Sequence, residues 1–348
     1  MTDLVSVIIP VYGTPLSVLR NCVESLAKQR GNGFLMEAVI IFDGDPEFDG
    51  TVVEDWEFPT VTVRTATIGH AGVSAARNAG IGMAAGQWAM FVDADDVLPD
   101  HAVESLLDFA RRHRCDVVMG AYRSVLDDAS NGEAEEHHYL TVDKVFNGEE
   151  RDGFCLDMLR PQKGIALAWG KLYAAPVLHG IQGFNELLSL GEDAEYAFRA
   201  CMAAKRIGYV DSMAYEYRRN AESAVRTFRT DYVQRTVAGI KALNATVARI
   251  DQPALRKQCV ECLDDYVLFH LTIIMINYLF NPNAPWNHGE RRKQYRQTLN
   301  LPIFRMPLRG YHGGRFPLTR QAALFSMKWH LYCVSAAIAW VRHRQFGD

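Results

Sequence analysis

Strand-like and helical patterns alternate through the first hundred residues, and this alternation constrains the fold more than any other feature. Four runs predict strands, and the first, VSVIIPV, is continuously apolar, as in a strand buried on both faces of a parallel sheet. Three further segments space their apolar residues as helices do. The predicted strands are residues 5–11, 38–42, 61–64 and 88–92, and the predicted helices are residues 16–26, 73–85 and 99–113.

This order predicts an α/β fold with a doubly wound, mostly parallel sheet covered by helices, in which ligands bind at the carboxyl ends of the strands. An acidic, polar stretch at 127–150 predicts a surface excursion, and helical spacing returns at 191–204. After about residue 229 the chain is mainly helical, with predicted loops at 281–289 and 301–317. The predicted domains are residues 1–230 and a mainly helical extension, residues 231–348.

The formal net charge is −4, so the chain lacks the basic excess that is typical of nucleic-acid-binding proteins. The average hides a basic tail. Residues 289–348 contain 11 Lys and Arg against two acids, a charge of +9 against −13 for the rest. A basic end on an acidic body suggests contact with anionic lipid, a phosphate-bearing substrate or a partner protein, and a merely solvated tail is the alternative.

Seven scattered cysteines, an odd number, predict free thiols rather than a disulfide framework. Cys259 and Cys262 have the spacing of metal ligands, but no second pair or nearby His completes a zinc site, so packing within a helix is the favoured interpretation. The N-terminus lacks the charged leader and cleavage site of a signal peptide. These features predict a cytoplasmic protein.

Two apolar segments raise the question of a membrane. Residues 266–280 are shorter than the roughly 20 residues that a spanning helix needs and contain His270 and Asn277, so they predict a buried helix. Residues 325–346 place tryptophans among basic residues, which fits a helix lying at a membrane interface. It equally fits a helix docked on the main domain. Peripheral contact with the inner face of a membrane is therefore one of two interpretations.

The densest group of carboxylates, Asp93-Ala94-Asp95-Asp96, directly follows a predicted strand. Adjacent acids repel one another, so they favour a hard cation, Mn²⁺ or Mg²⁺, whose remaining ligands would be diphosphate oxygens and water. The alternative is that one acid caps the next helix. Asp43-Gly44-Asp45 ends another strand, where an Asp can accept hydrogen bonds from a base or ribose, although Asp-Gly is also a common turn.

Two further polar segments have candidate roles. Residues 69–80 open a helix with small residues and then supply Arg77, which could bind phosphate or pair internally with an Asp at a strand end. Glu192 and Asp193 follow Gly191 at the start of another predicted helix, where they could project into a cleft. A carboxylate there could serve as a general base or could act only as a partner of the helix dipole.

Six motifs in this order resemble glycosyltransferase family 2, whose members have the GT-A fold. The resemblance covers about residues 4–225 and implies inverting transfer of a sugar from a nucleoside diphosphate, with UDP expected, to an acceptor hydroxyl. A glycan or lipid-linked acceptor, in the synthesis of a surface polysaccharide or glycolipid, is the expected setting. The motifs are Ser6-Val7-Ile8-Ile9-Pro10-Val11-Tyr12, Asp43-Gly44, Gly72-Val73-Ser74-Ala75-Ala76-Arg77-Asn78, Asp93-Ala94-Asp95-Asp96, Trp169-Gly170-Lys171-Leu172-Tyr173 and Glu192-Asp193.

The resemblance also implies roles for single residues. The metal would be held by Asp95, with Asp93 and Asp96 alongside, and Asp193 would be the base, with Glu192 beside it. Trp169 is a candidate acceptor contact, with ordinary packing as the alternative. The donor would be bound by Pro10, Val11, Tyr12, Asp43, Arg77, Asp93, Ala94, Asp95 and Arg218.

Two positions depart from the family pattern. The family commonly has two adjacent acids where this chain has Phe42-Asp43, so Asp43 alone would recognise the base and the metal is more strongly indicated than uracil. It also has Asn where this chain has Gly13, which would change only local backbone freedom. A catalytically inactive nucleotide-sugar-binding protein of the same fold is the alternative function, and the intact Asp95 and Asp193 argue against it.

Overall fold

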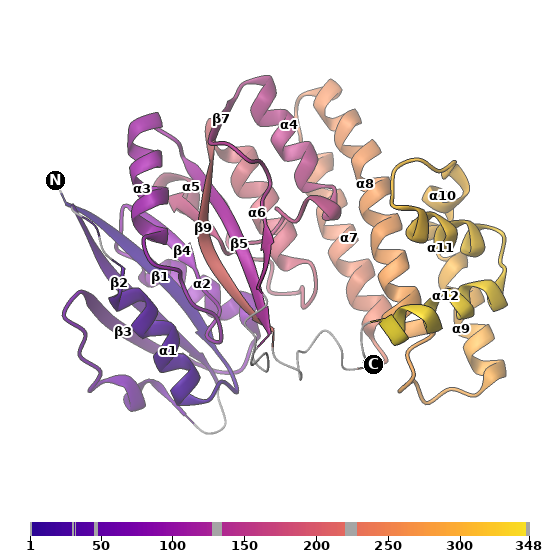
Figure 1. Ribbon diagram of the computed structural model, residues 1–348, viewed down its shortest axis with the longest axis horizontal. Helices are drawn as coiled ribbons and strands as arrows, with labels where there is room; N and C mark the ends of the chain where they lie inside the picture. Colours follow the sequence, from indigo (N-terminus) through magenta and orange to yellow (C-terminus); the bar gives the residue numbers. More distant parts are fainter. Residues whose placement is uncertain are drawn as a thin grey trace. The chain divides into compact units, whose positions relative to one another are not determined.

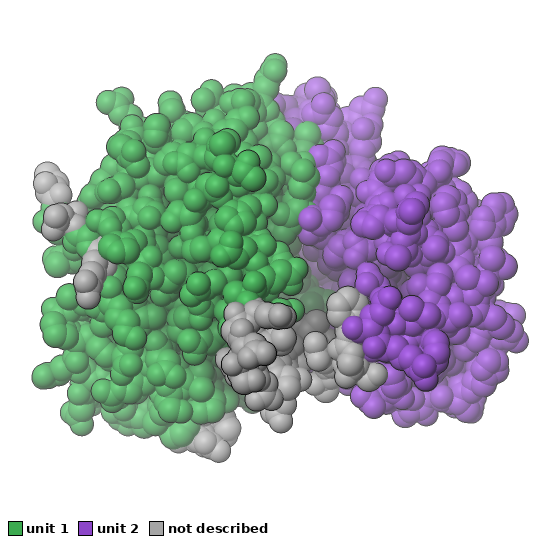
Figure 2. Space-filling view, viewed as in Figure 1, with its two compact units in different colours: residues 1–158, 163–221 green, residues 159–162, 222–348 purple. Residues whose placement is uncertain are grey.

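The computed structural model of the chain describes residues 2–29, 31, 33–44, 48–126, 134–219 and 228–345 (Figure 1). The chain divides into two units (Figure 2). The sheet unit comprises residues 1–158 and 163–221, and the helical unit comprises residues 159–162 and 222–348.

The sheet unit contains, within its described residues, one nine-stranded sheet with the order β3-β2-β1-β4-β8-β5-β9-β7 and with β6 paired to β5. The first four strands are parallel, β8 is antiparallel to both of its neighbours, and β5 and β9 are parallel to each other. β6 and β7 are antiparallel to their partners. The strands are β1 (Asp3–Val11), β2 (Phe34–Asp43), β3 (Val61–Ile68), β4 (Trp88–Phe91), β5 (Val117–Leu126), β6 (Ala134–His137), β7 (Lys144–Asn147), β8 (Lys171–Ala174) and β9 (Arg206–Arg219).

Helices cover both faces of the parallel part of this sheet, which explains its continuously apolar strands. Val5, Val7 and Ile9 of β1 belong to the same core as the apolar residues of α1 and α3. Ile8 faces the other side, where Gly80 of α2 lies against it. Alternate residues of one strand are thus buried on opposite faces. The helices are α1 (Leu16–Ala27), α2 (Val73–Met83), α3 (Ala102–His113), α4 (Glu149–Met158), α5 (Ala175–Gly180) and α6 (Glu192–Ala203), with short 3-10 turns at Gly50–Val53 and Pro161–Lys163.

The structure confirms the predicted fold class, but several boundaries differ. β2 and β3 extend beyond the predicted runs 38–42 and 61–64. The helix predicted from residue 99 begins at Ala102, because His101 has a left-handed φ of 62°, which a right-handed helix does not contain. The stretch predicted as a surface excursion contains β6, β7 and the start of α4, and its residues 127–133 lie outside the described residues.

The helical unit contains α7 (Tyr232–Ala248), α8 (Pro253–Ile274), which continues as a π-turn at Met275–Leu279, α9 (His288–Asn300), α10 (Pro302–Gly310), α11 (Leu318–Lys328) and α12 (Tyr332–Gln345). The loop predicted at 301–317 is wrong for its first half, which forms α10. Pro302 begins that helix, because a proline in the first turn lacks only an N–H that would stay unpaired.

The single helix predicted at 325–346 is also wrong, because the chain breaks between α11 and α12. His330 has a left-handed φ of 55° in this break. Phe346, at the end of that prediction, lies outside the described residues.

The segment 266–280 is a largely buried helical stretch, as predicted, and Leu271 and Ile274 are fully buried in it. None of the helices in the described residues is both long and apolar enough to cross a lipid bilayer. All seven cysteines are free, and six are buried, including Cys259 and Cys262 of α8. Cys333 is exposed.

Replacing Gly80 by alanine should destabilise the protein, because the new Cβ would lie 2.3 Å from Cγ2 of the fully buried Ile8. We expect Gly80→Ala to lower the free energy of unfolding by about 1–3 kcal/mol, measured by urea denaturation. Gly82→Ala is the matched control, since a Cβ at Gly82 meets nothing within 4 Å. In the same helix it should be neutral or stabilise by up to about 1 kcal/mol. Equal stabilities of the two variants would contradict this packing.

Candidate active site

The carboxyl ends of β2, β1 and β4 lie side by side, because these strands are parallel and β1 pairs with both of the others. Pro10 is half-buried at the end of β1, and Val11 is buried. Tyr12 follows and is 54% exposed. Its ring stacks on His70, with centroids 4.2 Å apart and planes 21° apart. This pair offers a flat surface on which a planar base could stack.

Asp43 ends β2 and anchors the loop that carries His70. Its buried carboxylate accepts hydrogen bonds from the backbone N–H groups of Ala71 at 2.7 Å and Gly72 at 2.9 Å. Gly44 lets the loop come this close to the end of β2, because its φ is +61° and a Cβ there would lie 2.4 Å from the His70 backbone nitrogen. Asp45, which shares this motif, lies outside the described residues.

The three acids that follow β4 have different surroundings. Asp96 is fully buried, and its carboxylate accepts hydrogen bonds from the Tyr215 hydroxyl at 2.6 Å and the Arg218 backbone N–H at 2.8 Å. Burial, together with the charge of Asp93, raises the pKa of Asp96 to about 8. The Asp93 side chain is 30% exposed and Asp95 is half-buried, whereas Ala94 between them is buried. Asp96 therefore faces the protein interior, and the other two acids keep exposed surface.

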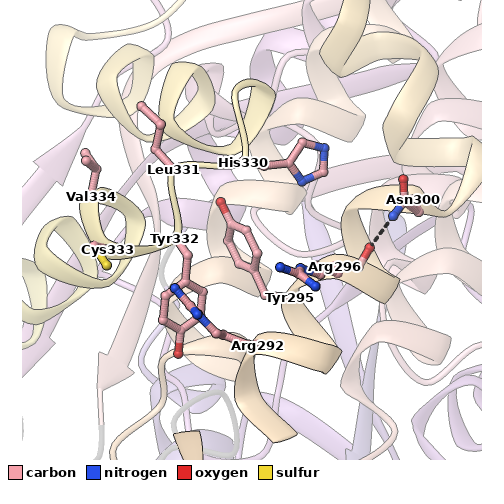
Figure 3. A pocket seen from close by; sticks show the side chains of 9 residues that line it. All are labelled: Arg292, Tyr295, Arg296, Asn300, His330, Leu331, Tyr332, Cys333 and Val334. Carbon is pink, nitrogen blue, oxygen red and sulfur yellow. Dashed lines mark hydrogen bonds between the residues drawn. The ribbon is translucent and has the colours of Figure 1, made fainter. Parts of the chain in front are cut away.

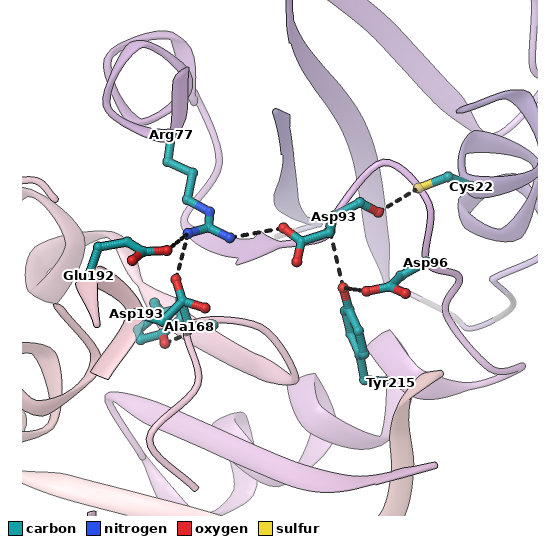
Figure 4. A network of polar contacts seen from close by, with 9 residues as sticks. Cys22, Arg77, Asp93, Asp96, Ala168, Glu192, Asp193 and Tyr215 are labelled. Carbon is teal, nitrogen blue, oxygen red and sulfur yellow. Dashed lines mark hydrogen bonds and ion pairs between the residues drawn. The ribbon is translucent and has the colours of Figure 1, made fainter. Parts of the chain in front are cut away.

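Arg77 of α2 connects the end of β4 to the start of α6 (Figure 4). Its guanidinium lies 2.9 Å from an oxygen of Asp93 and 2.5 Å from an oxygen of Asp193. Glu192 lies farther away, at 3.9 Å. The Arg77 side chain is only 3% exposed. Internal pairing with a strand-end Asp, one of the two predicted roles, is thus present, and phosphate binding by Arg77 stays a prediction.

Glu192 and Asp193 open α6 after Gly191, whose left-handed φ of 83° directs the chain into the helix. Burial and the charge of Asp193 raise the pKa of Glu192 to about 7. Burial also raises the pKa of Asp193, and the Arg77 guanidinium opposes that rise. A carboxylate whose pKa approaches the working pH is suited to general-base catalysis.

The motif that contains Trp169 and Lys171, at the start of β8, is buried in the protein interior. The buried Lys171 ammonium donates hydrogen bonds to the carbonyl oxygens of Ile165 at 2.8 Å and Leu167 at 2.6 Å, and burial lowers its pKa to about 8. Trp169 is 8% exposed and stacks on Tyr215, with ring centroids 4.3 Å apart. This is a packing role, and contact with an acceptor stays a prediction.

Arg218 of β9 has two separate functions in the fold. Its backbone N–H binds Asp96, while its side chain lies 3.5 Å from Glu216. The Arg218 side chain also lines a polar cavity of about 610 Å³, to which Lys28 and Arg123 contribute. Contact between Arg218 and a donor diphosphate stays a prediction.

The carboxylates after β4 fit a hard divalent cation that takes few ligands from the protein. No group of three His, Cys, Asp or Glu side chains that could hold a metal occurs among the described residues. Asp93 and Asp95 nevertheless supply partly exposed carboxylate oxygens, and Mg²⁺ commonly binds one or two carboxylates together with substrate phosphates. A cation at this site would therefore need the diphosphate of a donor to complete its ligands.

Comparisons with known proteins show what the chain resembles. The pattern of the family described as Glycosyl transferase family 2 matches residues 6–166. This match covers a little under half of the chain and shows a resemblance to glycosyl transferase family 2. It is 26% identical over 318 residues to the uncharacterized glycosyltransferase EpsJ of Bacillus subtilis, covering 89% of this chain and 87% of that protein. It is 24% identical over 230 residues to the minor teichoic acid biosynthesis protein GgaB of Bacillus subtilis, covering 65% of this chain and 24% of that protein.

The fold of this chain is also found in solved structures. The crystal structure of residues 1–349 of Staphylococcus aureus TarS in complex with UDP-GlcNAc matches with a TM-score of 0.67 and 15% identity. The match covers 100% of this chain and 93% of that one. This similarity confirms the predicted α/β architecture with a helical C-terminal region, which is consistent with the GT-A fold.

Sequence reasoning missed two side chains that shape this candidate site. His70 forms the stack with Tyr12, and its signal was a His within a run of small residues after β3. The Asn78 side chain accepts a hydrogen bond from the Phe184 backbone N–H at 2.7 Å and donates one to the Phe184 carbonyl oxygen at 2.9 Å. These bonds connect α2 to the loop before α6. It directly follows Arg77 in the motif, where only the charged residue received a role.

Glu192 should make stability depend on pH. The folded state holds this proton more tightly than the unfolded state, because the pKa is raised from 4.5 to about 7. The contribution of Glu192 to stability is therefore complete below about pH 4.5 and is lost as the pH rises through about 7. Glu192→Gln stays neutral, so its stability relative to wild type should rise by about 1–3 kcal/mol between about pH 5 and pH 8.

This shift is measured by urea unfolding at several pH values. Glu57→Gln, at an exposed carboxyl in the same unit, is the control and should show no such trend. A difference between Glu192→Gln and wild type that stays constant with pH would contradict the raised pKa.

Proposed function

We propose that this glycosyltransferase transfers a sugar, with inversion, from a UDP-sugar to an acceptor hydroxyl in the synthesis of a surface polysaccharide or glycolipid. One observation carries the proposal: a single buried guanidinium, that of Arg77, binds both Asp93, at the end of β4, and Asp193, at the start of α6. Inverting transfer needs a group that accepts a proton close to a site that binds the leaving diphosphate. Asp193 is the candidate for the group that accepts the proton, and Asp93 is the candidate for the site that binds the diphosphate.

The relatives support the donor and the setting. TarS has been crystallised with UDP-GlcNAc, and GgaB is a teichoic acid biosynthesis protein by name. In this chain, the stacked rings of Tyr12 and His70 would receive the base, next to the loop that Asp43 anchors. UDP is therefore the first nucleotide to test.

Asp193 is the proposed base. Its carboxylate accepts the proton of the acceptor hydroxyl while that oxygen attacks the anomeric carbon from the face opposite the diphosphate. The bond from the anomeric carbon to the diphosphate oxygen breaks, and the diphosphate leaves with the electron pair, so the configuration inverts. Arg77 stabilises the ionised form of Asp193 against its burial and fixes its position.

We further propose that Mn²⁺ or Mg²⁺ binds Asp95 and Asp93. A bound cation would neutralise charge that develops on the leaving diphosphate. The local charges favour such a cation, because Asp93, Glu192 and Asp193 share the Arg77 guanidinium and the Lys171 ammonium is bound to backbone carbonyls. Asp96, bound to Tyr215 and to the backbone of β9, would position the turn that carries Asp95 rather than bind the metal directly.

The proposed setting is the cytoplasm at the inner face of a membrane, with a glycan or lipid-linked acceptor. The support is chemical: residues 288–345 are rich in Lys and Arg, and the same segment exposes tryptophan side chains. Such a combination suits an anionic surface.

Calorimetric titration of UDP, GDP, CDP and dTDP, each with and without Mn²⁺, tests the donor site. We expect UDP to bind in the presence of Mn²⁺ and its affinity to fall about 10-fold or more without the metal or in Asp95→Asn. Asp100→Asn, an exposed acid after the same strand, should bind as wild type does. Failure of every nucleotide to bind would overturn the donor site, and equal binding with and without metal would overturn the metal assignment.

Replacing the base should separate turnover from binding. We expect Asp193→Asn to lower the release of UDP from a cognate UDP-sugar by about 10²–10⁴-fold, because general-base catalysis contributes that much, while UDP affinity changes only slightly. Glu192→Gln serves as the comparison and should retain more turnover. Full turnover in Asp193→Asn would show that Asp193 is not the base.

A further inference from the structure

The helical unit contains a cavity of about 510 Å³ beside the break between α11 and α12 (Figure 3). Arg292 and Arg296 of α9 line one side of it, and His330, Leu331 and Val334 line another. The two arginines are one helical turn apart and so share a face of α9. None of the predicted donor-site residues lines this cavity, so the transfer reaction proposed above gives it no role.

The cavity opens beside a group of exposed apolar side chains. Of the 13 large hydrophobic side chains exposed in the described chain, five lie between residues 329 and 341. Single exposed apolar residues are ordinary, but several so close together in the chain favour an interaction surface. These five form the α12 surface: Trp329 (68% exposed), Leu331 (49%), Val334 (46%), Trp340 (55%) and Val341 (44%).

The cavity and the α12 surface are continuous, because Leu331 and Val334 belong to both. Two arginines of this region also lie over aromatic rings. The Arg292 guanidinium lies 5.1 Å from the Tyr332 ring centroid, and that of Arg344 lies 4.0 Å from the Trp340 centroid. Cationic groups therefore adjoin apolar side chains at both ends of α12.

The charge of this region is complementary to an anionic partner. Residues 288–345 contain 11 Lys and Arg and a single acid, Glu290. That acid already serves the N-terminal capping box of α9. Large aromatic and aliphatic groups with arginines beside them are the features by which amphipathic helices enter the headgroup layer of a bilayer.

We propose that the cavity and the α12 surface bind a membrane of anionic phospholipid, with a lipid phosphate held between Arg292 and Arg296 and the α12 surface inserted among the acyl chains. The arginines supply hydrogen-bond donors in the fork geometry that phosphate oxygens accept. The tryptophans lie at the depth where indole rings are stable, between headgroups and acyl chains. The inference rests on the proposed membrane setting of the enzyme but not on its transfer chemistry.

Flotation of the full-length protein with vesicles tests the site directly. We expect binding to vesicles of phosphatidylglycerol mixed with phosphatidylcholine and at least about 10-fold weaker binding to phosphatidylcholine alone. The double variant Arg292→Gln/Arg296→Gln should lose about 10-fold or more of the anionic-vesicle affinity. Its matched control, Lys293→Gln/Arg309→Gln, removes the same charge at exposed positions outside the cavity and should lose about 3-fold or less.

Cys333 supplies a second measurement that needs no introduced cysteine. It lines the cavity and is the exposed member of the seven cysteines, so its alkylation by iodoacetamide reports access to the site. Anionic vesicles should slow this alkylation in wild type and should not slow it in Trp329→Ser/Trp340→Ser. The thermal unfolding midpoint of each variant must match wild type, and the comparison of the two vesicle types needs no variant.

Several outcomes would overturn the proposal. Absence of binding to anionic vesicles, or equal losses in the two double variants, would remove the lipid site. Protection of Cys333 by inorganic phosphate alone would indicate a phosphate-ion site, and protection that grows with protein concentration without vesicles would indicate a second copy of the chain. Vesicle binding is measured without nucleotide and nucleotide binding without vesicles, so this proposal and the proposed function can fail separately.

Discussion

The candidate active site depends on the ion pairs of one buried guanidinium. Arg77 binds Asp93 and Asp193, which come from elements a hundred residues apart in the chain, and Glu192 lies close by. A buried ion pair gains little over apolar packing, but losing one partner leaves an uncompensated charge that costs about 3–5 kcal/mol. Arg77 therefore keeps the end of β4 and the start of α6 together, and the carboxylates in turn keep Arg77 charged in the interior.

The pairing does not balance the charge of this group, and the imbalance explains its proton affinities. Two neighbouring acids and one arginine cannot all be satisfied at a buried position, so burial raises the pKa of Glu192 to about 7. Asp193 is closer to Arg77, which opposes the same rise. The two residues therefore differ in their surroundings: Arg77 favours the ionised form of Asp193, whereas Glu192 lies farther from Arg77 and has a pKa of about 7.

The sequence predicts the parallel half of the sheet well and the rest poorly, and the reason is burial. β1 and β2 are covered on both faces, so their residues form apolar runs that are visible without any partner. β5 to β9 were not predicted, because β6, β7 and β8 are only four residues long and the pairing of the longer strands depends on distant partners, as in β5 with β9. α10 was missed because Pro302 was taken as a loop residue, although a proline suits the first turn of a helix.

For the candidate site, the sequence locates the acids but not their partners. The sequence alone does not distinguish Asp93, Asp95 and Asp96, and all three were predicted to bind a metal. What separates them comes from β9, more than a hundred residues away, where the Tyr215 hydroxyl and the Arg218 backbone bind Asp96 and turn it inward. Local pattern cannot contain such a contact, because the register that brings β9 beside β5 is set by the whole sheet. The same reasoning applies to Asp43, whose two backbone partners place His70 against Tyr12, so a residue predicted to touch the donor also shapes the surface on which the donor would lie.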